Sequence, residues 1–216
     1  MAGVLAALAA QAWWEGRQER ARERDYLRQL LVDTRENERR LGDAIGIDSV
    51  SGVSVARAMT ALLASGPLPP PDSLGEWVRG SGSSSDPRLV TGTYQALMGT
   101  GDLRLVRNDS LRARLATYAA ELGSETERQR QLRGAMQDAV PAMARALPFM
   151  RGVFLGDAHP GATDVARFRT DPEVGGVLLT LQAASVNRLS GLRHLREETR
   201  ALLRALEADP TLRDTP

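Results

Sequence analysis

The chain has 216 residues, of which 42% are apolar and 25% charged, as is usual for a protein with a sizeable core. A net charge of +1 provides no field to attract nucleic acid, and the lack of cysteine excludes disulfides and thiolate chemistry. Aromatic residues make up only 4%, whereas the sequence is rich in Ala, Leu and Arg. This composition favours helices over sheets, so we expect an all-α fold.

Residues 1–14 are predicted to form an apolar, membrane-associating segment. The apolar run ends in a pair of tryptophans, and arginines follow. Apolar side chains, then indoles, then guanidinium groups match the order of environments from the bilayer interior to water. The side chains that we expect to contact lipid or a partner protein are Val4, Leu5, Leu8, Trp13, Trp14, Arg17 and Arg20.

The apolar run from Ala2 to Trp14 is short for a membrane span. Its 13 residues form about 20 Å of helix, whereas the hydrocarbon core is about 30 Å thick. In one interpretation the sequence begins partway through a spanning helix. In two others the segment enters one leaflet or packs on other membrane proteins. A signal peptide cleaved near Ala10-Gln11-Ala12 and a buried core helix are the remaining alternatives.

The first helix is expected to run from Gly3 to Leu41 or Ile45. Residues 15–25 form a charged stalk in which acids and arginines alternate at helical spacing, as Glu19 and Arg22 do. An apolar stripe then predicts entry into a single helical domain over residues 26–209, followed by a tail over 210–216.

Shorter helical segments are predicted in the middle of the chain. A helix over 53–64 ends before the prolines of 67–71, because proline has no amide hydrogen to donate. One turn is expected over 72–79 and a flexible loop over 80–85. The next helix is expected to begin at Asp86-Pro87 and to run to Met98.

A turn is predicted over residues 99–109, where two glycines allow backbone angles closed to other residues. A capping residue follows them, either Asn108 or Asp109. Within this turn, 102–107 is expected to be a connector or a helical turn. The following helix should break near Gly123 and kink at Pro141, and residues 149–169 should form a loop.

The last long helix is expected to open at Thr170-Asp171-Pro172 and to reach Ala208. Its apolar residues follow a spacing close to a heptad, and its length of about 55 Å requires an equally long partner. We therefore expect the terminal helices to lie antiparallel as a spine that carries the shorter helices. Four residues of the first helix should face the stripe from Leu192 to Leu206, namely Tyr26, Leu27, Leu30 and Leu31.

Three stretches of the chain resemble an uncharacterised bacterial family, a domain of unknown function with one N-terminal membrane span. They are AQAWWEGRQERARERDYLRQLLVD, TYQALMGTGDLRLVRNDSLRARLATY and FRTDPEVGGVLLTLQAASVNRL. The resemblance implies an all-helical domain outside the cytoplasm, at the periplasmic face of the bacterial inner membrane. It implies no activity, because the family has none assigned.

The sequence carries no pattern typical of an enzyme. His159 and His194 are isolated, without carboxylates at metal-ligand spacing, and no serine lies in a Gly-x-Ser-x-Gly turn. We therefore expect no catalytic residue, no metal and no cofactor. Five arginines at helical spacing form a basic face, interpreted first as solvated and second as a docking face for a carboxylate or lipid headgroup: Arg188, Arg193, Arg196, Arg200 and Arg204.

The favoured hypothesis is a non-enzymatic, membrane-associated scaffold. It would be an accessory subunit that braces or assembles a larger membrane complex, of the respiratory or photosynthetic type for example. Its expected partners are membrane lipids and other membrane protein subunits, not nucleic acid, with self-association through the long helices as an option. The alternative is a sensor or ligand-binding domain that signals through its first helix, and a hydrolase assembled only in the fold ranks third.

Overall fold

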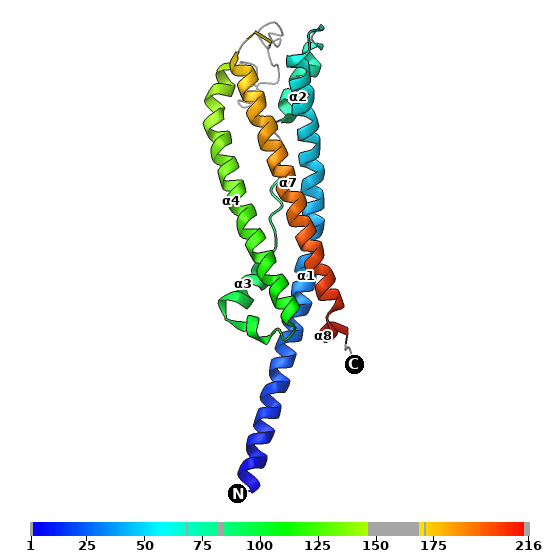
Figure 1. Ribbon diagram of the computed structural model, residues 1–216, viewed down its shortest axis with the longest axis vertical. Helices are drawn as coiled ribbons and strands as arrows, with labels where there is room; N and C mark the ends of the chain where they lie inside the picture. The colour runs from blue at the N-terminus through cyan, green and yellow to red at the C-terminus, as the bar shows by residue number, and fades with distance from the viewer. Residues whose placement is uncertain (1, 68, 82–83, 147–168, 171, 214–216) are drawn as a thin grey trace. The chain divides into compact units, whose positions relative to one another are not determined.

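The computed structural model describes residues 2–67, 69–81, 84–146, 169–170 and 172–213, and these residues contain helices and no strand. The predicted all-α fold is confirmed. The long helices are α1 (Ala2–Leu63), α4 (Asp109–Ala146) and α7 (Pro172–Ala208) (Figure 1). The short helices are α2 (Pro71–Ser81), α3 (Gly92–Gly99), the 3₁₀ helix η1 (Asp102–Leu105) and α8 (Pro210–Arg213).

The chain divides into two compact units, and each long helix contributes to both. Unit 1 consists of Met1–Arg40, Arg88–Leu122 and Leu195–Pro216. Unit 2 consists of Leu41–Pro87 and Gly123–His194. Each unit has its own buried apolar side chains, and the single domain expected over 26–209 stays a prediction.

In unit 1, α1 lies antiparallel to α7. Arg35 donates a hydrogen bond of 2.9 Å to Glu207, and Glu38, one turn later on α1, accepts one of 2.9 Å from Arg196, earlier on α7. The buried apolar side chains come from α1, α3, η1 and the residue after it, α4 and α7, and they are Leu27, Leu30, Leu97, Leu105, Val106, Leu111, Leu115, Tyr118, Leu195, Leu202 and Leu206.

In unit 2, α1 and α7 are antiparallel as well. Arg188 donates a hydrogen bond to Asp48, and further along α1 Gly52 lies against Ser185, whose Oγ is 3.0 Å from where a Cβ of Gly52 would be. The core draws on α1, α2 and α7, with Leu41, Ala44, Val55, Ala58, Ala61, Leu74, Val174, Val177, Leu178, Leu181 and Leu192 buried. The expected pairing of the terminal helices therefore holds within each unit.

One residue of the predicted spine faces elsewhere. Leu27 and Leu30 are buried as expected, and Leu31 is half-buried. Tyr26, however, donates a hydrogen bond to Asp102 of η1 instead of facing α7. The phenolic hydroxyl accounts for this difference, because a partly buried O–H requires an acceptor that an apolar stripe cannot offer.

The prediction that the first helix ends by Ile45 was wrong, because α1 continues to Leu63 and includes the helix expected over 53–64. Gly42, Gly46 and Gly52 do not end it. A glycine inside a helix costs only about 1 kcal/mol relative to alanine, which tertiary packing can offset. At Gly52 the missing side chain also makes room for Ser185 and Leu189 of α7.

The prediction that a helix begins at Asp86 was also wrong, because residues 84–91 are not helical and α3 begins at Gly92. The amide of Asn37 explains this. It accepts a hydrogen bond of 2.7 Å from the backbone N–H of Val90 and donates one of 2.8 Å to its carbonyl. Both backbone groups of Val90 are thus satisfied outside a helix, and Arg88 turns the chain with a φ of 41°.

The turn predicted over 99–109 is confirmed. Gly101 has a φ of 73°, in the left-handed region that favours glycine, and Asp102–Leu105 form a helical turn. Leu105 and Val106 are buried, whereas Arg104 and Arg107 point outward. Asn108 is the cap of α4, because its Oδ1 accepts hydrogen bonds from the N–H groups of Ser110 and Leu111.

Two other helices are longer than predicted, and one has the predicted bounds. α2 is longer than the expected single turn over 72–79 and includes the first two residues of the loop expected over 80–85. α4 runs through Gly123 without a break, and Pro141 lies inside it. α7 spans Pro172 to Ala208, as predicted. The loop expected over 149–169 lies outside the described residues except for Arg169, where the prediction was wrong because this residue is helical.

Replacing Leu195 by alanine tests the α7 side of the unit 1 core. Leu195 is 1% exposed, so the Leu195→Ala variant should lose about 2–5 kcal/mol of unfolding free energy in urea titrations. Leu179, which is 61% exposed on the same helix, supplies the control. The Leu179→Ala variant should stay within about 0.5 kcal/mol of the parent, and equal losses from both would contradict this placement.

Replacing Gly101 by alanine tests the turn. A Cβ at a φ of 73° costs about 1–2 kcal/mol, and thermal unfolding should show this destabilisation. The matched control is Gly123→Ala, since Gly123 is helical and has open space where a Cβ would be. That change should stabilise the protein by about 0.5–1 kcal/mol. Two shifts of the same sign would refute the assignment.

Candidate functional site

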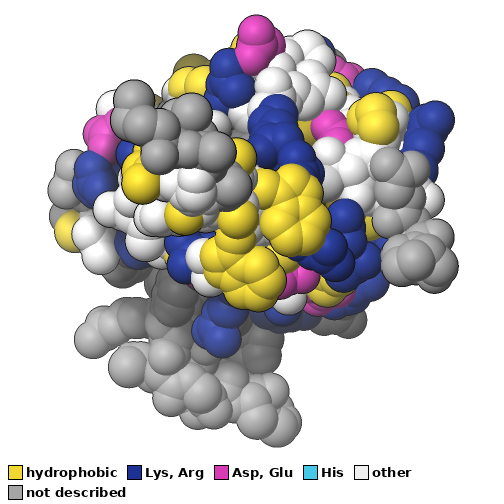
Figure 2. All heavy atoms as spheres, turned by 90° about the horizontal axis from the view of Figure 1, so that it is seen from below, with side chains coloured by type: hydrophobic (Ala, Val, Ile, Leu, Met, Phe, Trp, Pro, Cys, Tyr) yellow, Lys and Arg dark blue, Asp and Glu magenta, His cyan; other side chains and the backbone are white. Residues whose placement is uncertain are grey.

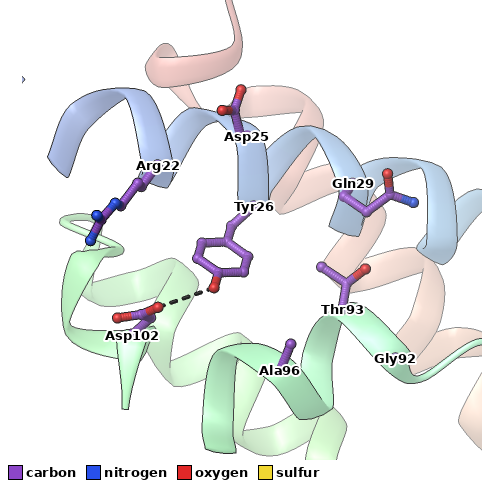
Figure 3. A pocket seen from close by; sticks show the side chains of 8 residues that line it. All are labelled: Arg22, Asp25, Tyr26, Gln29, Gly92, Thr93, Ala96 and Asp102. Carbon is purple, nitrogen blue, oxygen red and sulfur yellow. Dashed lines mark hydrogen bonds between the residues drawn. The ribbon is translucent and has the colours of Figure 1, made fainter. Parts of the chain in front are cut away.

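A pocket lies in unit 1, where α1, α3 and η1 meet (Figure 3). Its volume is about 610 Å³. Four side chains of α1 form one wall, α3 forms the facing wall, and the first residue of η1 closes one end. The lining residues are Arg22, Asp25, Tyr26, Gln29, Gly92, Thr93, Ala96 and Asp102.

Tyr26 and Asp102 form the hydrogen bond at the η1 end of this pocket. The Tyr26 hydroxyl donates to Oδ2 of Asp102 over 3.0 Å. Asp102 reaches this position because the left-handed conformation of Gly101 turns the chain immediately before η1. The donated proton leaves the tyrosine oxygen and the second carboxylate oxygen as acceptors for a ligand.

Gln29 and Thr93 are held by a buried carboxylate beside the pocket. Asp33 is 8% exposed and accepts hydrogen bonds from Nε2 of Gln29, at 2.9 Å, and from Oγ1 of Thr93, at 2.6 Å. Gln29 and Asp33 belong to α1, whereas Thr93 belongs to α3. Asp33 therefore fixes the position of α3 against α1 and keeps the pocket open in one geometry.

The pocket can bind polar groups, and two hydroxyls of its lining donate to carboxylates, Tyr26 to Asp102 and Thr93 to Asp33. Arg22 contributes a cation, and Asp25 forms an ion pair of 3.7 Å with Arg28. Nearby on α3, burial raises the pKa of Tyr94 above its ordinary value of 10. Among the described residues, no group of three His, Asp or Glu side chains could hold a metal ion. His194 is exposed on α7, and His159 lies outside the described residues.

The predicted membrane-contact residues lie on the exposed N-terminal part of α1. Val4, Leu8, Trp13 and Trp14 are 67%, 58%, 57% and 63% exposed, so none of the described segments buries them. The side chain of Leu5 is outside the described part. In the view from below, large apolar side chains lie beside basic ones on this face (Figure 2).

Arg17 and Arg20 are exposed on the same stretch of α1. The Cζ atom of Arg17 lies 5.5 Å from the centroid of the Trp13 ring, which is cation–π distance. The indole and the guanidinium group therefore form one exposed surface, with an apolar face and a cationic edge.

The five arginines of the predicted docking face have different environments. Arg188 is 9% exposed in unit 2, where it donates to Asp48. Arg196 and Arg200, in unit 1, both donate to Oε1 of Glu38 at 2.9 Å. Arg193 and Arg204 are exposed. A docking role for the set stays a prediction, and Arg193 and Arg204 present the most accessible charges.

Glu38 is stabilised in its charged form by these contacts. Burial by itself would raise the pKa of Glu38, but the hydrogen bonds from Arg196 and Arg200 outweigh it and hold the pKa below its ordinary value of 4.5. The cluster is thus a structural ion pair between α1 and α7 within unit 1.

Sequence reasoning missed a set of buried polar side chains on α1. Each one bonds a neighbouring segment of its own unit: Glu23 accepts from the N–H of Arg107 at 2.7 Å, and Asp48 accepts from the N–H of Ser85 at 2.9 Å. Ser51 donates to the carbonyl of Ser81 at 3.1 Å. A usable signal existed, because the buried stripe of α1 repeats every three or four positions, and these residues fall in register with its apolar members, as do Asp33, Thr34 and Asn37.

The comparisons with known proteins identify no relative. No family model matches the chain, and neither a curated protein nor a solved structure shows significant similarity to it. The resemblance to the uncharacterised membrane family therefore stays a prediction. Among the described residues, no helix is both long enough and apolar enough to cross a membrane.

The lowered pKa of Glu38 predicts a pH-dependent contribution to stability. A carboxyl group whose pKa falls on folding stabilises the protein above its unfolded pKa, and the contribution is lost as the pH falls through the folded value. Glu38→Gln should therefore destabilise at about pH 7 and have little effect at about pH 2, as measured by urea unfolding. The control is Glu197→Gln, at an exposed position of α7. An equal effect of Glu38→Gln at both pH values would contradict the ion pair.

Proposed function

We propose that the protein is a non-enzymatic helical scaffold that attaches to a membrane surface through the first turns of α1, as an accessory subunit of a larger membrane complex. The observation that carries the proposal is the uncovered apolar stretch with Val4, Leu8, Trp13 and Trp14. Large apolar side chains left exposed in one segment are typical of an interaction site.

The order of these residues along α1 suits contact with a lipid bilayer. Indole rings favour the headgroup level of a bilayer, and the guanidinium group of Arg17 beside Trp13 can bind a lipid phosphate through two donors. Burying side chains such as Val4 and Leu8 supplies roughly 1.5–3 kcal/mol each. Such a segment gives reversible attachment, and stable residence takes a second contact. A membrane protein subunit would provide it.

The location of the scaffold belongs to the proposal as well. The family resemblance supports the periplasmic face of the bacterial inner membrane. The charged stretch that follows Trp14 supports a helix that continues into water, because acids and arginines alternate along it.

The pocket of unit 1 favours a second candidate, a sensor or ligand-binding domain. Small-molecule sites usually combine a concave surface with a few converging polar groups, and Tyr26, Asp102 and Arg22 meet this description. Half of the lining residues lie on α1, so a bound ligand would contact the same helix that bears the exposed apolar segment. This supports α1 as the element through which such a sensor would signal.

The membrane attachment is tested by replacing both indoles. The full chain should co-sediment with vesicles of phosphatidylcholine and phosphatidylglycerol, and the Trp13→Glu/Trp14→Glu variant should bind at least about 100-fold more weakly. The matched control is Val32→Glu, which changes another exposed apolar residue of α1 in the same way and should bind like the parent.

Two results would contradict the attachment. One is a full chain that binds neither these vesicles nor the membrane fraction of cells. The other is equal binding by the Trp13→Glu/Trp14→Glu variant. A lone protein that co-purifies with a bound small molecule, and not with membrane subunits, would favour the sensor.

A further inference from the structure

An apolar ridge runs along the exposed side of α1 in unit 2. Ile47, Val50 and Val53 are 51%, 69% and 51% exposed, and they follow one another at intervals of three residues. At about 100° per residue, Ile47 and Val53 lie roughly 60° on either side of Val50, so the three form one surface. The core residues of this stretch, such as Ala44 and Val55, are buried on the opposite side of the helix.

Charged residues end this ridge on both sides of Val50. Asp43 and Arg57 are each seven residues from Val50, which is close to two helical turns, and both are exposed. They therefore lie on the same face as Val50. We call this surface, made of Asp43, Ile47, Val50, Val53 and Arg57, the Val50 ridge.

The residue types of the ridge indicate a partner. β-Branched side chains lose rotamer freedom in a helix, and the exposed face of a helix usually carries residues with better helix propensity. Three adjacent β-branched side chains that are each more than half exposed gain only part of the burial that unit 2 could give them. Burial against another surface supplies the stabilisation that they lack here.

We propose that the partner is a second copy of this chain, bound through the Val50 ridge with the two α1 helices antiparallel around a two-fold axis at Val50. In this arrangement Val50 meets Val50 of the other copy, and Ile47 meets Val53. Asp43 faces Arg57 of the other copy, and this pair forms twice. The ridge is thus complementary to itself, which is what a two-fold interface requires.

The charges determine the direction of pairing. A parallel arrangement would put Asp43 next to Asp43 and Arg57 next to Arg57, and like charges at such positions repel. Asp43 also has a contact within its own chain, but a carboxylate can accept several hydrogen bonds and can serve both. Gly46 lies near the ridge with open space where a Cβ would be, so a partner helix can approach closely.

The size of the ridge sets the strength of the dimer. From Asp43 to Arg57 the surface extends about 21 Å at roughly 1.5 Å per residue. One helix face of this length buries an area at the low end of specific interfaces, so dimerisation should depend on protein concentration. The two ion pairs at its ends should make it weaker at high salt.

Charge exchange gives the decisive experiment. Sedimentation equilibrium of the full chain in lipid-free, low-salt buffer should show a monomer–dimer equilibrium. Asp43→Arg or Arg57→Asp alone should raise the dimer Kd by about tenfold or more, because each single change places like charges opposite each other twice. The Asp43→Arg/Arg57→Asp double variant should restore the parent Kd.

Two further variants complete the design. Val50→Arg should abolish the dimer, and Leu179→Arg, at an equally exposed position on α7, should leave it intact. Circular dichroism of each variant checks that the helices remain folded. The series is repeated with Trp13→Glu/Trp14→Glu, so that failure of the membrane proposal and failure of the dimer are distinguished.

Three results would overturn the proposal. They are a parent chain that is monomeric at every concentration, single charge variants that dimerise like the parent, and a double variant that does not recover. The last would show that any dimer uses another register or another surface.

Discussion

The described structure depends on polar side chains that α1 keeps buried and directs at the backbone of other segments. In unit 1, Asn37 satisfies both backbone groups of Val90, and Glu23 accepts the N–H of Arg107. In unit 2, Asp48 accepts the N–H of Ser85, and Ser51 donates to the carbonyl of Ser81. A buried group left unpaired costs about 1–3 kcal/mol, so each bond fixes where a connecting segment may lie.

These bonds also explain how the pocket of unit 1 acquires its shape. Apolar contacts are non-directional, and leucines alone would allow α3 to slide or rotate on α1. Asp33 removes that freedom, because it holds Thr93 of α3 and Gln29 of α1 at the same time. At the other end of the pocket, Tyr26 of α1 donates to Asp102 and so holds η1 in place. The pocket is the space between α1, α3 and η1, with a polar bond from α1 to α3 at one end and from α1 to η1 at the other.

The sequence predicted the elements that follow from periodicity and from backbone chemistry. The stripe of α7, the turn at Gly101 and the cap at Asn108 all follow local rules, and the structure confirms them. The sequence did not predict the continuation of α1 through Gly52, because the contacts at this glycine come from α7, more than 100 residues away. The non-helical segment before α3 was missed for the same reason, since a side chain of α1 holds it. The pocket depends on three such segments and could not be located in advance.

The spacing of the buried polar groups limits how α1 can change in length. One residue inserted between Glu23 and Asp33 would turn the two positions by about 100° relative to each other. Either Arg107 or Thr93 would then lose its partner. Seven added residues would nearly restore the common face, but they would separate the two positions by about 10 Å along the axis. Natural variants of this protein should therefore keep the length of this stretch constant and accommodate insertions elsewhere.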